Sequence, residues 1–333
     1  DQTLRICVTR LNSNGSIDSS FGTAGLVTTL IAQESVVGGV VIDAVDRIVV
    51  AGSCLGVATN YDFCLARYAA GNGAPDPTFG SNGQVVTTFA VGQNADERIH
   101  ALAISPRNHD IIVAGRCPGP HSTTHFCVAR YRSDGSLRTT FGSNGIVYGS
   151  PGGIPSNNSA VALALQLDEK IVVGGQCDNA ICLMRWHANG SVDTTLDGAY
   201  GSTGISRLSF PETSLSGLKA IALQRDGSII VLAGCLHSAQ QNGVFCMTRL
   251  WPEGYVDTSF NYEDAYVYVD VSVGGWPTDV AVAMMAEFMR QAVVGQPRLP
   301  MSSRVVFTAF SVAATCITSN RSMLMAMVLS RRR

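Results

Sequence analysis

The chain has 333 residues, of which 46% are apolar and only 14% are charged, and its formal net charge is −2. This balance gives no long-range attraction to nucleic acid or to an anionic membrane surface, so we expect neither as a partner. The 34 glycines and the small charged fraction are typical of a chain built from buried strands and turns.

The first predicted element is a single strand at 4–11, and a complete unit of four strands follows it. The strands of this unit are predicted at 25–30, 39–43, 47–53 and 63–69. Each of them is short and rich in valine, isoleucine, threonine or aromatic residues, which favours strand over helix.

The pattern of this unit recurs along the chain. The segment FCLARYAAGNGAPDPTFGSNGQVVTTF has one related copy before it and three after it. Measured at one arginine in each copy, the spacings are 57, 63, 55 and 64 residues, and the arginines are Arg10, Arg67, Arg130, Arg185 and Arg249. A unit of four short strands cannot bury its own apolar faces and must stack on its neighbours, as a propeller blade does.

We therefore predict an all-β fold, a β-propeller of about five four-stranded blades that forms one domain over 1–333. If the sequence is a piece of a longer protein, the complete ring would have five to seven blades. The predicted units are approximately 25–69, 83–131, 145–186, 204–250 and 266–329.

The strand at 4–11 has no preceding strands of its own. Either a preceding blade lies outside this sequence, or the strand closes the ring by pairing with a blade already present. The fourth strand of a unit is expected at the outer edge of its blade, where unpaired backbone groups recruit another strand. We therefore expect 4–11 to pair with the strand at 304–311, displacing 322–329, or to pair with a neighbouring chain.

Four units carry two cysteines each, one after a strand of the type IVVAG and one inside the strand of the type FCLARY. Each pair spans a hairpin, where cross-strand side chains come within disulfide range. Buried reduced cysteines are the alternative, and a zinc site is disfavoured because two ligands fall short of four. The predicted pairs are Cys54 with Cys64, Cys117 with Cys127, Cys177 with Cys182, and Cys235 with Cys246.

In the last unit, alignment on the other copies places Ser311 and Leu324 in the two cysteine positions. Cys7 and Cys316 are left over. They could bond to each other if 4–11 closes the ring, although Cys316 lies five residues beyond its expected position.

Disulfides require an oxidising compartment, and they favour a secreted or cell-surface location. Four N-x-S sequons are compatible with a secretory route and make the chain a candidate glycoprotein: Asn14, Asn157, Asn189 and Asn320. The apolar segment 305–317 is shorter than the ~20 residues that a spanning helix needs, so we expect no membrane span.

The runs ALQLDEKIVVGGQC and ALQRDGSIIVLAGC, with the FCLARY and GSLRTTFGSNGIV segments, resemble the delta-60 repeat. That unit occurs in tandem in secreted and surface proteins and is expected to form a β-propeller. The resemblance covers nearly the whole chain and implies no general catalytic residues. The last unit departs from the pattern through an insertion at 284–300, which is therefore the first place to look for a feature special to this protein.

No enzyme motif stands out, and no catalytic residue, cofactor or metal is predicted. There is no HExxH, G-x-S-x-G or phosphate-binding loop, and the SxDxGxxW box of sialidase propellers is missing. His121 and His125 are the nearest approach to a metal site, and we interpret them as solvated loop residues.

One aspartate position also recurs and invites a calcium or catalytic hypothesis. Its residues are Asp18, Asp76, Asp193 and Asp257, but the third copy has Arg138 there. This departure favours a turn-capping or arginine-pairing role.

Three functions are compared. The favoured one is a secreted, non-enzymatic propeller that acts as a structural or protein-interaction module, with a protein or extracellular-matrix partner or with copies of itself through edge strands. The alternative is a carbohydrate-binding, lectin-like propeller in which Trp186, Trp251 and Trp276 would stack on sugars, although the first two occupy packing positions of the repeat. An enzyme with a site in the central channel is the third and least favoured.

Overall fold

The structure is a computed structural model. It describes the residues 3–12, 14–56, 60–89, 96–119, 123–153, 157–178, 180–196, 203–211, 213–237, 243–261 and 264–270, with the short strands 281–282, 305–306, 315–316 and 326–329.

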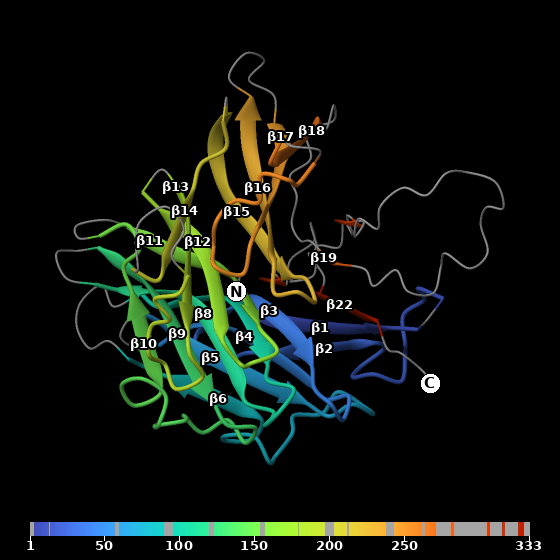
Figure 1. The fold of residues 1–333 in the computed structure, drawn as a ribbon. Coiled ribbons are helices and arrows are strands. Elements are labelled where there is room, and N and C mark those ends of the chain that lie inside the picture. Colours follow the sequence, from blue (N-terminus) through green and yellow to red (C-terminus); the bar gives the residue numbers. More distant parts are fainter. Residues whose placement is uncertain are drawn as a thin grey trace.

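The described residues form five four-stranded sheets and contain no helix, which confirms the all-β propeller of about five blades (Figure 1). The first blade consists of β3 (Glu34–Ile42), β4 (Ile48–Leu55), β5 (Tyr61–Tyr68) and β6 (Gln84–Thr87). The second consists of β7 (Arg98–Ile104), β8 (Ile111–Pro118), β9 (Thr124–Tyr131) and β10 (Ile146–Gly149).

The third blade consists of β11 (Asn158–Leu165), β12 (Ile171–Cys177), β13 (Ala180–Trp186) and β14 (Ile205–Leu208). The fourth consists of β15 (Thr213–Leu223), β16 (Ile229–His237), β17 (Gly243–Leu250) and β18 (Tyr266–Asp270). In these four blades, each strand pairs antiparallel with the next one along the chain.

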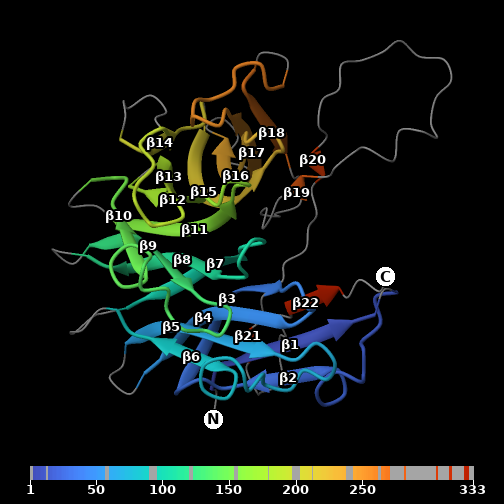
Figure 2. The same cartoon turned by 60° about the horizontal axis from the view of Figure 1, so that its bottom comes forward.

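The fifth blade is assembled from both ends of the sequence. Its strands are β1 (Arg5–Leu11), β2 (Leu26–Thr29), β21 (Thr315–Cys316) and β22 (Ala326–Leu329). One edge of β1 pairs with β2, and the other pairs with β21 in antiparallel and with β22 in parallel orientation. Figure 2 shows β22 beside β1. A separate pair of strands, β19 (Ala281–Val282) and β20 (Val305–Val306), completes the described elements.

Blade boundaries are offset by one strand from the sequence units. The first strand of each unit pairs with the last strand of the preceding unit, so that β2 completes the sheet of β1 and β6 that of β5. The expectation that the fourth strand lies at the outer edge is therefore wrong, because the next unit covers that edge. The pairing predicted for 4–11 with 304–311 is also wrong, since β1 pairs with β21 and β22 instead.

The apolar cores lie between neighbouring blades. The first strands of the sheets, β3, β7, β11 and β15, pack on one another in turn, and β1 packs on β3. Because side chains alternate along a strand, β5 serves two cores. Cys64 and Tyr68 pack with Val8 of the fifth blade, whereas Phe63 packs with Ile111 of the second.

A glycine in the second strand of the first three blades allows the innermost strand to bulge. A Cβ atom on Gly52, Gly115 or Gly175 would lie 2.0, 1.7 or 2.1 Å from a carbonyl oxygen of the innermost strand. The register of the two strands shifts at or next to each of these contacts. Glycine is required here because the two backbones approach too closely for any side chain.

Candidate functional site

The recurring arginines form ion pairs with the recurring aspartates. Arg67 Nε lies 2.9 Å from Asp76 Oδ2, and Arg185 Nε lies 2.7 Å from Asp193 Oδ2. The same pair joins Arg10 to Asp18 and Arg249 to Asp257. Each aspartate also caps its own turn, as in the 3.0 Å hydrogen bond that the Thr195 amide donates to Asp193 Oδ1. Turn capping and arginine pairing are thus combined in one residue, and neither calcium binding nor catalysis is needed to explain the position.

The same arginines hold neighbouring blades together. Arg130 Nη1 donates to the Ala188 carbonyl in the next blade at 2.9 Å, and Arg185 Nη1 donates to the Pro252 carbonyl at 2.6 Å. Arg67 reaches the Ser133 carbonyl and Arg10 reaches the Ala70 carbonyl in the same way. We call the arginine, its carboxylate partner and the carbonyl of the next blade the inter-blade latch.

In the second blade the charges of this latch are exchanged. In the first and third blades, a second cation also contacts the aspartate, and it stands just before the second strand of the blade. Arg47 lies 3.4 Å from Asp76, and Lys170 lies 3.1 Å from Asp193. In the second blade the cation's position holds Asp110, which accepts a hydrogen bond from Arg138 Nη2 at 2.6 Å.

Asp110 also pairs with Arg130 at 2.8 Å, so the latch arginine keeps a carboxylate partner. Sequence reasoning missed Asp110, although the simultaneous change of sign at two aligned positions was visible.

The carboxylates of the latch make folding sensitive to acid. Burial raises the pKa of Asp193, but hydrogen bonds from Thr195 and the cations Lys170 and Arg185 outweigh burial and leave the pKa far below its usual range. The pKa values of Asp76 and Asp257 are also lowered. Burial raises them, but the hydrogen bonds that Thr78 and Ser259 donate and the charges of the paired arginines outweigh burial.

We expect stability to fall steeply as the pH drops below about 4, near the unfolded carboxyl pKa. A carboxylate whose pKa is depressed in the folded state stabilises the fold above its unfolded pKa, and this contribution is lost as the pH falls towards the folded pKa. Urea unfolding measured from neutral to acidic pH tests the prediction. A midpoint that stays constant down to about pH 2 would show that these pairs contribute nothing.

The four predicted cysteine pairs are disulfide-bonded: Cys54 with Cys64, Cys117 with Cys127, Cys177 with Cys182, and Cys235 with Cys246. Their Cα atoms lie 5.8 to 6.0 Å apart. Within each hairpin the bonded residues are diagonal neighbours on one face. These bonds indicate an oxidising environment.

The histidine pair does not form a site in the described residues. His125 lies in β9 and is partly buried, with Nδ1 3.2 Å from Ser150 Oγ, so the interpretation as a solvated loop residue is wrong for it. Burial lowers its pKa. His121 lies outside the described residues, and in the described part of the chain no three His, Cys, Asp or Glu side chains could hold a metal ion together.

The two tryptophans among the described residues differ in burial. Trp186 is fully buried between the second and third blades, as expected for a packing position. Trp251 is 42% exposed, so the packing interpretation is wrong for it, and the neighbouring Tyr255 is 46% exposed. Trp276 lies outside the described residues, as does the insertion 284–300.

The sequons remain predictions. Asn14, Asn157 and Asn189 are exposed. The side-chain oxygens of Asn14 and Asn189 each accept a hydrogen bond from the serine of the same sequon. Asn320 lies outside the described residues.

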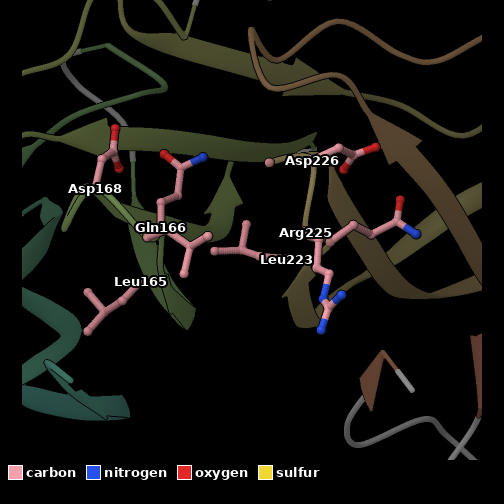
Figure 3. Close-up of a pocket in the computed structure, with 9 residues that line it drawn as sticks. Leu165, Gln166, Asp168, Leu223, Arg225 and Asp226 are labelled. Carbon is pink, nitrogen blue, oxygen red and sulfur yellow. The ribbon is translucent and has the colours of Figure 1, made fainter. Parts of the chain in front are cut away.

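A pocket of about 420 Å³ lies between the third and fourth blades. It is lined by 165–168 and 223–227, the turns that join the first two strands of each of these blades. Figure 3 shows Leu165, Gln166 and Asp168 on one side and Leu223, Arg225 and Asp226 on the other. Sequence reasoning missed this pocket.

In the part of the chain that the structure describes, the pocket lies where the equivalent of the Ser105–Glu169 bridge is lost. Between the second and third blades, Ser105 Oγ donates to Glu169 Oε2 at 2.6 Å and Arg107 Nη2 donates to the Leu167 carbonyl at 2.7 Å. Gln166 and Gly227 take the places of Ser105 and Glu169 between the third and fourth blades. Glu169 and Gly227 share a positive φ, 68° and 88°, but glycine has no carboxylate to offer.

Hydrogen-bond acceptors are therefore left over in the pocket. Among the described residues, the side-chain oxygens of Gln166 and Gln224 are buried and have no hydrogen-bond partner. The carboxylates of Asp168 and Asp226 lie on the same turns, and each accepts a hydrogen bond from the backbone two residues further on. In Figure 3 the Arg225 guanidinium extends away from both carboxylates. Unpaired buried acceptors are costly, so the pocket is suited to a ligand that donates hydrogen bonds.

Comparison with known protein families supports the fold. A family model described as a β-propeller domain of unknown function (DUF5122) matches residues 1–21, 46–79, 166–196 and 224–260. The match supports a β-propeller repeat family without singling out the delta-60 repeat. The search of curated proteins found no match. Among the described residues, no helix is long and apolar enough to cross a membrane.

Proposed function

We propose that this chain is a secreted, non-enzymatic β-propeller built from delta-60 repeats, which serves as a protein-interaction module of an extracellular assembly. Its hairpin disulfides suit an extracellular environment. The recurring charged residues are engaged in the inter-blade latch. Recognition is therefore left to the turns, which is where a rigid scaffold usually carries it.

The pocket between the third and fourth blades is the observation that carries this proposal. Its unpaired acceptors, the oxygens of Gln166 and Gln224, lie on the same two turns as the carboxylates of Asp168 and Asp226, of which Asp168 also pairs with Lys170 Nζ at 3.4 Å. A lysine or arginine side chain supplies several donors and a positive charge, which matches this set. We propose that the pocket takes such a side chain from a protein partner.

The test uses the double substitution Asp168→Asn with Asp226→Asn. Asparagine keeps the oxygen that accepts the backbone hydrogen bond of each turn but loses the charge. The unmodified protein should bind immobilised peptides that carry lysine or arginine more tightly than the same peptides with acetyl-lysine or citrulline. In the double variant, binding to the charged peptides should be about tenfold weaker than in the unmodified protein.

Asp134→Asn is the matched control, because Asp134 caps an exposed turn of the second blade in the same manner. It should bind as the unmodified protein does. Equal binding of the charged and neutral peptides, or equal loss in the control, would contradict the pocket's role.

The carbohydrate-binding alternative has one observation in its favour, the partial exposure of Trp251 and Tyr255, although the Arg249 guanidinium lies over the Trp251 ring at 5.8 Å. Exposed aromatic rings can stack on sugar faces. A glycan array separates the two functions: glycan binding that is lost in Trp251→Ala and kept in the Asp168 and Asp226 double variant would favour the lectin-like alternative.

A further inference from the structure

The four hairpin disulfides obey one register rule. In each, the cysteine of the second strand lies opposite the residue two positions before its bonded partner. Cys54 lies opposite Asp62 and bonds Cys64, and Cys117 lies opposite His125 and bonds Cys127. The remaining pairs follow the rule through Ala180 and Val244.

The fifth blade satisfies the same rule with strands from opposite ends of the sequence. Cys316 in β21 lies opposite Arg5 in β1, which is two positions before Cys7. In register, β21 therefore takes the place of a second blade strand and β1 that of a third. The hairpin that links these strands in every other blade is absent between them, because they are far apart in the sequence.

Pairing with the outermost strand gives the same placement independently. In the first four blades, the cysteine of the third strand lies opposite the third residue of the outer strand. The pairs are Cys64 with Val86, Cys127 with Tyr148, Cys182 with Arg207, and Cys246 with Tyr268. Cys7 lies opposite Thr28, which is the same position of β2. Cys7 is also buried, with 2% of its surface exposed.

The sequence supports this register once β21 is known. The run VAATCI at 312–317 aligns with VAGSCL at 50–55, which places Cys316 rather than Ser311 in the first cysteine position. Of the ten cysteines, eight are bonded in hairpins, and Cys7 is itself disulfide-bonded.

We infer that Cys7 and Cys316 form a fifth disulfide, which fastens the two ends of the repeat array within one blade. Its formation joins the two sulfur atoms and removes two protons and two electrons from the thiols. The electrons pass to a disulfide oxidant, either a thiol–disulfide oxidoreductase or oxidised glutathione, which is reduced to its two thiols. The bond turns an array held by backbone pairing into a covalently closed ring.

Peptide mapping under non-reducing conditions tests this bond in the unmodified protein. The expected product is a linked pair of peptides that contain Cys7 and Cys316, and it should disappear on reduction. Alkylation of either cysteine in the unreduced, denatured protein would overturn the inference, as would a Cys316 link between two chains.

A thiol count in variants gives a second readout that does not depend on correct folding. Denatured, unreduced Cys7→Ser should show one free thiol, assigned by mapping to Cys316. The control Cys54→Ser should show one at Cys64. A Cys7→Ser variant without a free thiol at Cys316 would mean that Cys316 bonds elsewhere.

Discussion

Replacing Cys7 by serine should destabilise the protein more than replacing Cys64 by serine, although both cysteines are almost completely buried. A disulfide stabilises mainly by restricting the unfolded chain, and the effect grows with the loop that it closes. Cys54 and Cys64 are 10 residues apart, whereas the proposed partners span most of the sequence. The loop model gives about 3 kcal/mol for a loop of roughly 10 residues and about 6 kcal/mol for one of roughly 300.

Chemical unfolding of the two variants and the unmodified protein measures this difference. We expect Cys7→Ser to lose about 3 kcal/mol more than Cys64→Ser. After full reduction the gap between the variants should close, because neither bond then restricts the unfolded chain. Equal losses in the oxidised proteins would contradict the ring-closing bond.

Asp110 and Arg138 should prove strongly coupled when the second blade is given the charge order of the first and third blades. Arg138→Asp leaves Asp110 facing a second carboxylate. Asp110→Lys removes the carboxylate that Arg130 and Arg138 share and places a third cation beside them. Asp110 is almost fully buried and Arg138 is mostly so, with side chains 1% and 30% exposed. Removing one partner of a buried pair is expensive, so each single variant should lose about 3 kcal/mol.

The double variant recreates the arrangement of Lys170 and Asp193 in the third blade. It should lose only about 3 kcal/mol, well below the sum of about 6 kcal/mol for the two single variants, which gives a coupling energy of about 3 kcal/mol in a double-mutant cycle from urea unfolding. A double variant whose loss equals the sum of the single losses would mean that the two charges do not interact.

The parts of the fold that depend on local pattern could be predicted from the sequence. The strands, the number of blades and the four hairpin disulfides all follow from short segments that recur in order. The turn-capping and arginine-pairing roles of Asp193 were also predictable, because Arg138 at the same position rules out a fixed calcium ligand.

The parts that depend on pairing between distant segments could not be predicted. A repeat has no natural starting strand, so the sequence unit gave no sign that β2 belongs with β1. The insertion before β21 shifted the alignment and placed Ser311 where Cys316 belongs. The pocket arises from a missing side chain at Gly227 between two turns, and such an absence shows only after the blades are placed side by side.

Hydrogen exchange of the backbone amides of β1 tests the closed five-bladed ring most directly. In the structure β1 is an interior strand, paired with β2 on one edge and with β21 and β22 on the other. Its amides are therefore expected to be protected to the same degree as those of β5 and β9, which are interior strands of the first and second blades. Rapid exchange throughout β1, with β5 and β9 still protected, would contradict the closed ring.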